Sequence, residues 1–250
     1  MNDDPLRDGV RQLLRTVRCE EWTFHRVLTD EERERSGADG APEILGLQIL
    51  GLQIRELIYR ASESRQYATL MLREVAAGRG ADGCAEPPAG PVGTWDEVHH
   101  QAHEAMTGLL AALDAMTEEQ LAVNPGPVRS HPQYLWRDIT NMSVRSPMLG
   151  YSQWHRRHGR RFESLAVLGR WYEAVRATDL PTKALSDVSY DLACGLSGAG
   201  RLDDAMRYLP DAFTYNDRAA VGVLKAWARE DPDLAPLADR TDFRTLVGAA

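Results

Sequence analysis

The chain has 250 residues, which is enough for one large domain or two small ones and for a sizeable buried core. Hydrophobic residues make up 43% and charged residues 26%, a balance typical of globular proteins that excludes a disordered or fibrous chain. The net charge of −8 argues against direct binding to nucleic acid, because proteins that bind its phosphates usually carry a basic excess.

Other features of the sequence indicate the cellular compartment of the protein. No stretch reaches the roughly 18 apolar residues that a membrane-spanning helix needs, so we expect no membrane contact. The first residues, MNDDPLRDG, are acidic and lack the apolar core of a secretion signal, which favours the cytoplasm. Cys19, Cys84 and Cys194 are far apart and odd in number, so neither a disulfide framework nor a cysteine zinc site is predicted.

The N-terminal part predicts two long helices. Apolar residues recur at helical spacing over 5–29, which predicts the first helix, and the polar stretch that begins at Asp30 ends it. Pro42 suits the first turn of a second helix, which we expect to run to about Ala77. From Ile44 its sequence, ILGLQILGLQIRELI, is apolar nearly all round, as in a buried helix. The Gly- and Pro-rich segment that follows predicts a loop.

Two further helices are predicted before residue 160. Thr94 followed by Glu97 forms a capping box, which predicts a third helix over 94–115. A turn-rich connector leads to a fourth helix that begins near Gln133 and ends at Gly159. Pro147 should kink or split that helix, because proline lacks the backbone N–H.

The pattern of the chain changes after Gly159. A helix is predicted at 162–177, and within 184–217 two more helices meet at Gly198–Gly200. No alternation typical of strands appears in the sequence. We therefore predict an all-α fold with a domain boundary within 159–182.

Residues 1–160 resemble the DinB-like four-helix bundle superfamily. The motifs that carry this resemblance are PEILGLQILGLQ before the long loop, TWDEV at the next helix start, LAALDAMTEEQL, and LWRDITNM. Within the superfamily, the region is most similar to the branch that contains the ClbS/DfsB proteins. The resemblance implies a bundle of four helices over 1–160.

Residues 186–217 resemble one tetratricopeptide-type helical hairpin. Small or apolar residues stand where that repeat has them: Leu192, Ala193, Gly200, Ala205 and Ala212. Pro210 departs from the repeat pattern and predicts a kink in the second helix. A single hairpin cannot bury both of its faces alone. The module 161–250 is therefore expected to pack on the bundle or on a partner chain, as in a homodimer.

Many DinB-like proteins bind a divalent metal through three histidines, one in the second helix and two spaced four residues apart in the fourth. The resemblance places these positions near Gln48, Arg145 and Leu149, none of which is histidine. It therefore implies a protein without that metal, and no cofactor is predicted. Members of the ClbS/DfsB branch are associated with protection from electrophilic, DNA-damaging natural products, which implies hydrolysis or capture of a reactive small molecule.

Glu21 is the first candidate for catalysis. It falls between Val17 and Phe24 on the apolar line of the first helix. A buried carboxylate must be paired, or protonated with a raised pKa, and this is a recognised route to a general acid or base. Alternatively, the helix is rotated slightly and Glu21 lies at the boundary of the core. Trp22 lies beside it and is a candidate for substrate binding.

Three histidines, His99, His100 and His103, cluster in the third helix. His103 borders the apolar stripe at Met106, and because histidine titrates near neutral pH it is the second candidate for proton transfer. His99 and His103 are four residues apart and could share a metal if a third ligand joined them. A solvated or half-buried cluster without a chemical role is the remaining interpretation.

Gln48, Asn141 and Arg145 lie at or next to the positions of the missing metal ligands, and we predict that they orient a ligand. Polar groups that face a bundle interior must be hydrogen-bonded, to each other, to water or to a ligand. An arginine there would suit an anionic or carbonyl-bearing ligand. The alternative is placement on the surface, because Asn141 and Arg145 flank the Ile139–Met142 stripe.

The sequence therefore predicts a metal-independent protein that acts on a small molecule in a pocket between the first, second and fourth helices. It would hydrolyse, rearrange or capture a reactive natural product in specialised metabolism or self-resistance. One alternative is a cyclase or isomerase of natural-product biosynthesis that uses the same pocket. The other is a non-enzymatic adaptor or dimerisation module.

Overall fold

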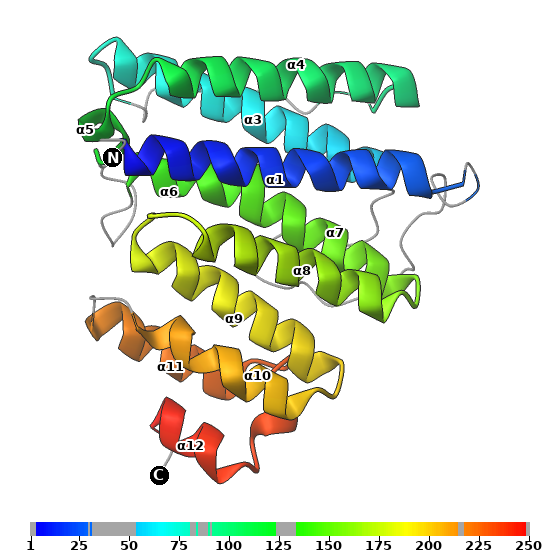
Figure 1. Ribbon diagram of the computed structural model, residues 1–250, viewed down its shortest axis with the longest axis vertical. Helices are drawn as coiled ribbons and strands as arrows, with labels where there is room; N and C mark the ends of the chain where they lie inside the picture. Colours follow the sequence, from blue (N-terminus) through cyan, green and yellow to red (C-terminus); the bar gives the residue numbers. More distant parts are fainter. Residues whose placement is uncertain are drawn as a thin grey trace. The chain divides into compact units, whose positions relative to one another are not determined.

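The computed structural model describes residues 4–29, 31, 54–80, 84, 90, 92–123, 134–214 and 218–248. Over these ranges the regular secondary structure is entirely helical and contains no β-strand, which confirms the predicted all-α fold (Figure 1). The candidate Gln48 and the expected start of the second helix, over 42–53, lie outside the described residues.

The chain divides into two compact units, Met1–Gly159 and Arg160–Ala250. This boundary lies one residue from the division at 160/161 expected from the sequence. Each unit is described below by itself.

Unit 1 contains four helical lines, each formed by one long helix or by helices that follow one another without a break. Its elements are α1 (Pro5–Val27), α3 (Ile54–Ala76), α4 (Trp95–Asp114), the short α5 (Glu118–Leu121), α6 (Leu135–Thr140), the π-helical turn η2 (Asn141–Arg145) and α7 (Ser146–Arg157). The last three follow one another without interruption and form one line. Both α1 and α3 pack against α4 on one side and against the α6–α7 line on the other (Figure 1). The described helices of this unit therefore form a four-helix bundle around one core.

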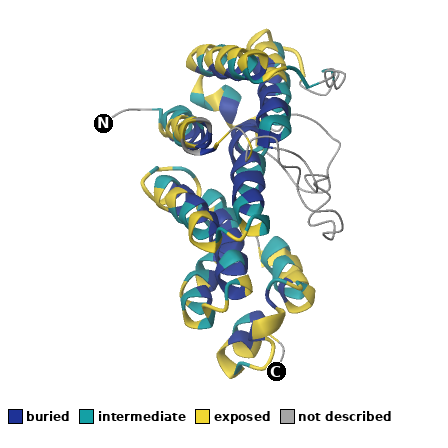
Figure 2. Cartoon of the chain, turned by 90° about the vertical axis from the view of Figure 1, so that its right-hand side faces the viewer, coloured by how far each residue is buried: buried dark blue, intermediate teal, exposed yellow. Residues whose placement is uncertain are grey.

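The core of unit 1 follows from the spacing of apolar residues along each helix. Side chains three and four positions apart share one helical face, so each helix turns an apolar stripe inward. Fully buried members of these stripes include Val10, Leu14, Val17, Ile58, Leu72, Leu109, Leu113 and Met148. Figure 2 shows such buried residues in dark blue on the inner faces of the helices. Burial of each large side chain of this kind contributes about 1.5–3 kcal/mol.

The predicted start of α4 is confirmed. Thr94 Oγ1 accepts a hydrogen bond from the backbone N–H of Glu97, and the Glu97 carboxylate accepts one from the backbone N–H of Thr94 at 2.7 Å. The two side chains thus satisfy backbone donors that have no partner within the helix. This cap fixes the end of α4 that lies one turn before the histidine cluster.

The predicted irregularity at Pro147 is also present. Proline has no N–H to donate to the preceding turn. The structure accommodates this in η2, where the N–H of Ser146 bonds to the carbonyl of Asn141, five residues back. Asn141 and Arg145 therefore lie at the two ends of a π-helical turn, a feature often found at functional sites.

The described part of unit 2 is also helical. Its elements are α8 (Arg161–Arg176), α9 (Thr182–Gly198), α10 (Leu202–Tyr208), the 3-10 turn η3 (Leu209–Phe213), α11 (Arg218–Glu230), the 3-10 turn η4 (Ala235–Leu237) and α12 (Thr241–Val247). α9 packs against α8 and against α10 with η3.

The hairpin between α9 and α10 turns at Gly200, whose φ of +78° is a left-handed conformation that favours glycine. The N–H of Gly200 bonds to the carbonyl of Ser197, and the N–H of Arg201 bonds to that of Leu196, which is the Schellman arrangement. As expected from its departure from the repeat pattern, Pro210 interrupts the second helix, which continues as the 3-10 turn η3.

None of the described helices is both long enough and apolar enough to span a membrane.

We predict that Thr94→Ala lowers the free energy of unfolding by about 1 kcal/mol, because the helix loses its N-cap. Urea denaturation followed by circular dichroism measures this change. Thr107→Ala is the matched control, since Thr107 is exposed within the same helix and alanine is the better helix former. Equal stabilities of the two variants would contradict the role assigned to the cap.

Candidate functional site

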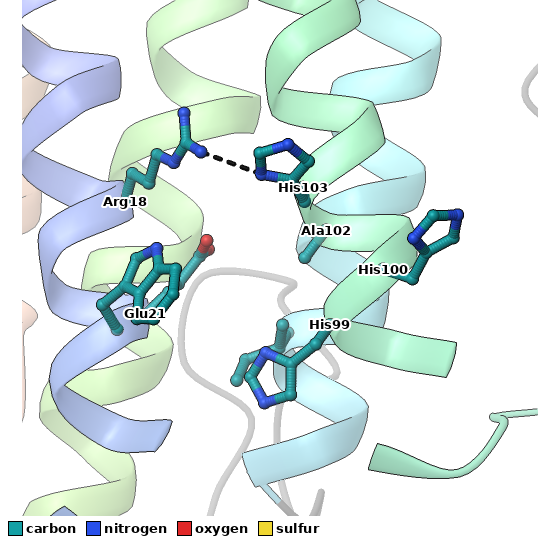
Figure 3. Close-up of a pocket in the computed structure, with 8 residues that line it drawn as sticks. Arg18, Glu21, His99, His100, Ala102 and His103 are labelled. Carbon is teal, nitrogen blue, oxygen red and sulfur yellow. Dashed lines mark hydrogen bonds between the residues drawn. The ribbon is translucent and has the colours of Figure 1, made fainter. Parts of the chain in front are cut away.

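A pocket of about 340 Å³ opens in unit 1 between α1, α3 and α4. Its lining residues are Arg18, Glu21 and Trp22 from α1, Ile58 from α3, and His99, His100, Ala102 and His103 from α4. Figure 3 shows Arg18 and Glu21 projecting from α1 toward the helix that carries His103 and Ala102. Helical spacing explains this grouping, because positions i, i+3 and i+4 share one face on each helix.

The position of this pocket differs from the sequence-based expectation. The pocket was expected between the first, second and fourth helices, whereas α4, the third long helix, supplies half of the lining. The reason lies in the packing of α4 against α1, where the small side chain of Ala102 leaves space that a larger residue would fill. Ile58 and Ala102 are buried and form the inner wall, while Trp22 and His103 are exposed at the opening.

Glu21 is buried and paired, as one of the sequence-based alternatives predicts. Arg65 of α3 donates to both of its carboxylate oxygens, at 3.0 Å to Oε2 and 2.5 Å to Oε1. Tyr151 of α7 donates a third hydrogen bond to Oε1, at 2.6 Å. The side chains of Arg65 and Tyr151 are fully buried, and that of Glu21 is 9% exposed. The network therefore links three of the four helical lines at the inner end of the pocket.

Burial and charge act together on these groups. Burial, the largest single effect, would lower the pKa of Arg65, but the charge of Glu21 and the further interactions with Glu21 and Tyr151 together outweigh it, and the pKa is raised. Burial, reinforced by the charge of Glu21, raises the pKa of Tyr151 well above its usual range. The phenol therefore keeps its proton and donates a hydrogen bond to the Glu21 carboxylate.

Arg65 and Tyr151 are site residues that the sequence analysis did not identify. Arg65 stands on the buried face of α3, at helical spacing between Ile58 and Ala68. A buried arginine is rare unless it is paired, so an arginine on an apolar stripe is the signal that pointed to a partner for Glu21. Tyr151 gave no comparable signal, because a tyrosine on an apolar stripe is an ordinary core residue.

Arg18 and His103 meet across the outer part of the pocket. The guanidinium of Arg18 lies 2.9 Å from Nδ1 of His103 (Figure 3). Arginine has only donors, so Nδ1 must accept, and a neutral imidazole of this kind carries its proton on Nε2. His103 therefore presents an N–H donor on the ring atom that Arg18 does not contact.

The other two histidines have different surroundings. The ring of His99 stacks on Trp95, with centroids 5.3 Å apart and planes inclined by 26°. His100 lies 3.1 Å from Glu104 in an exposed pair and points outward from α4 (Figure 3). His99 and His103 both line the pocket, as a shared metal would require. In the described part of the chain, however, no three His, Cys, Asp or Glu side chains come together as metal ligands.

The remaining sequence candidates have separate positions. Trp22 lines the pocket and is 55% exposed. Asn141 and Arg145 are half-buried in η2 and do not belong to the lining of this pocket. The structure thus brings together Glu21, Trp22 and His103, and leaves the predicted ligand-orienting residues of the fourth helix outside this group.

No family model, no curated protein and no solved structure matches this chain.

We predict that Arg65→Met destabilises the protein by about 3–5 kcal/mol, because it leaves a carboxylate buried without its cation. The double variant Glu21→Leu with Arg65→Met should recover most of this loss, since no unpaired charge remains. Urea denaturation measures both. The control is Arg60→Met in the same helix, where a partly exposed ion pair with Glu63 predicts a loss of less than about 1 kcal/mol. A loss in Arg65→Met no larger than in this control would contradict the network.

A second prediction concerns the protonation of His103. Nitrogen NMR near neutral pH should show a proton on Nε2 of His103 and an unprotonated Nδ1, because an N–H of Arg18 donates a hydrogen bond to Nδ1. In Arg18→Gln, the Nδ1 signal of His103 should shift while the signals of His100 stay in place. A proton on Nδ1, or no response to the loss of Arg18, would contradict the contact.

Proposed function

We propose that this chain binds a reactive small molecule in the pocket between α1 and α4 and hydrolyses, rearranges or captures it. The observation that supports this most directly is the convergence of Glu21, Trp22 and His103 on one pocket. Its volume, about 340 Å³, lies at the lower end of the range of small-molecule sites. Such sites combine apolar walls with a few polar groups, and here Ile58 and Ala102 supply the walls.

The proposed chemistry is proton transfer by Glu21 and His103. Each carboxylate oxygen can accept about two hydrogen bonds. Oε1 of Glu21 already accepts from Arg65 and Tyr151, whereas Oε2 accepts only from Arg65 among the described residues. Oε2 can therefore take a proton from water or from an O–H or N–H group of the ligand. The Nε2–H of His103 can supply a proton to the atom that leaves.

For hydrolysis of a strained ring, these two roles give a balanced reaction. The oxygen of water forms a bond to the electrophilic carbon and its proton passes to Oε2 of Glu21. The ring bond breaks, the leaving atom takes the proton from Nε2 of His103, and a water molecule returns a proton to Nε2 in the same step, so that no imidazolate forms. Glu21 returns to its starting state by giving its proton to water. A cyclisation or isomerisation would use the same pair, with the ligand in the place of water.

The sequence resemblance is part of the proposal. We infer a DinB-like bundle of the ClbS/DfsB type, acting in the cytoplasm on a natural product and not on nucleic acid. The absence of a metal from this chemistry rests on the residues near the family's histidine positions, Gln48, Arg145 and Leu149. The described part of unit 1 has the four-helix arrangement that this resemblance implies.

One observation supports the alternative of an adaptor or dimerisation module. The helix α11 of unit 2 exposes Val223 and Trp227, which are 63% and 49% accessible and lie four residues apart on one face. Exposed apolar surface of this kind is common at protein interfaces. Dimerisation that depends on concentration, and that Trp227→Ala abolishes, would favour this alternative.

The enzymatic proposal is tested with a panel of strained electrophiles: an epoxide, a cyclopropane and a β-lactone, each attached to an aromatic ring. We expect the protein to consume at least one of them faster than buffer does, or to form an adduct detected by intact mass. His103→Gln should reduce the rate about 10²-fold or more if His103 supplies the proton. The matched control is His158→Gln, because His158 lies at the C-terminal end of α7 and does not line the pocket.

Equal rates in the two histidine variants would contradict the role of His103. The proposed activity on electrophiles would be contradicted if the protein showed no turnover of any member of the panel and formed no adduct with any of them.

A further inference from the structure

The outer part of the pocket carries a positive charge, although the chain as a whole has a net charge of −8. Arg18 is half-buried in the lining, and one of its N–H groups is used on Nδ1 of His103. Among the described residues no other partner takes up the rest of the planar guanidinium, which can bind water or a ligand. The carboxylate in the lining, Glu21, does not offset this charge, because Arg65 already pairs with it behind the pocket.

The inner part of the pocket has the opposite hydrogen-bonding character. Glu21 is an acceptor, and three donated hydrogen bonds from Arg65 and Tyr151 fix its orientation. One acceptor position remains at Oε2 when the described partners are counted. A ligand that donates no hydrogen bond here would leave Oε2 removed from water and without a donor, which is unfavourable. A ligand with a donor at its inner end would satisfy it.

We propose that the pocket takes a small organic acid whose carboxylate binds Arg18 and whose hydroxyl or amino group, at the opposite end, donates to Oε2 of Glu21. This inference rests on the proposed function and names the class of its ligand. Carboxylates are the groups that guanidinium binds most specifically, through two parallel hydrogen bonds. The Nε2–H of His103 offers a further donor at the same end as Arg18.

The remaining walls suit a flat apolar centre in such a molecule. Ile58 and Ala102 are buried in the lining, and the exposed indole of Trp22 stands at the rim. An aromatic ring between the acid and the donor would place its apolar faces against these walls. A para-substituted aromatic acid is therefore the probe of choice, because its two polar groups stand at opposite ends of one flat ring.

Three probes that differ by one group each test this proposal on the full-length chain. They are 4-hydroxybenzoate, which has both groups, benzoate, which lacks the donor, and methyl 4-hydroxybenzoate, which lacks the charge. Titrations followed by nitrogen–proton NMR give dissociation constants and report on the indole of Trp22 and the guanidinium of Arg18. We expect 4-hydroxybenzoate to bind about tenfold more tightly than either of the other two, because each lost contact involves a charged group.

Variants assign the carboxylate contact. Arg18→Gln should weaken the binding of 4-hydroxybenzoate about tenfold and leave the binding of the methyl ester unchanged. Arg15→Gln is the matched control, because Arg15 is exposed on the same helix and does not line the pocket. The donor contact is assigned by the benzoate comparison on the unaltered protein, since a change at Glu21 would leave Arg65 buried without a partner.

Three outcomes would overturn the proposal: the ester binds as tightly as the acid, Arg18→Gln binds the acid unchanged, or the acid gives no saturable shift up to about 10 mM. Tight binding of the ester with shifts at Trp22 would overturn the ligand class and leave the pocket of the proposed function in place. The proposed function is tested independently of this ligand class, by the reaction rates with the electrophile panel and by the effect of His103→Gln on them.

Discussion

The hydrogen-bonded ion pair of Glu21 with Arg65, completed by Tyr151, is the constraint on which the organisation of unit 1 depends. Two charges taken out of water are costly, and each needs the other and its full set of hydrogen bonds. The pair therefore fixes the rotation of α1 and α3 about their axes, and Tyr151 adds α7. A buried pair of this kind contributes little net stability compared with apolar packing, but it specifies one arrangement of the helices.

The same constraint explains how a carboxylate comes to lie beside the apolar inner wall of the pocket. Without Arg65, a carboxylate at position 21 would need water or a proton. With Arg65 and Tyr151 behind it, Glu21 presents an oriented acceptor to the pocket, while Ala102 on α4 leaves the space in front open. The donors Arg18 and His103 then stand at the outer end. The proposed ligand class follows from this separation of acceptor and donors.

The sequence was sufficient for features that depend on neighbouring residues. The all-α class, the cap at Thr94 and the interruption at Pro147 each follow from local hydrogen bonding or from helical spacing. The partner of Glu21 could not be predicted in this way. Arg65 is 44 residues away and Tyr151 is 130 residues away, so the pairing depends on how the helices pack.

The described pocket lies at a different place from the expected one for a related reason. The helical pattern shows which residues share a face, but it does not show which neighbouring helix covers that face. The residues expected to orient a ligand in the fourth helix, Asn141 and Arg145, do not line this pocket. The space instead opens beside α4, where a small side chain, Ala102, faces α1.

A structure of the full chain with 4-hydroxybenzoate bound would test the central claim most directly. The account predicts density in the pocket between α1 and α4, with the carboxylate on Arg18, the hydroxyl on Oε2 of Glu21, and the Arg65 pair unchanged behind it. Density for the probe at another place on the molecule, or in the pocket in the reverse orientation, would contradict it.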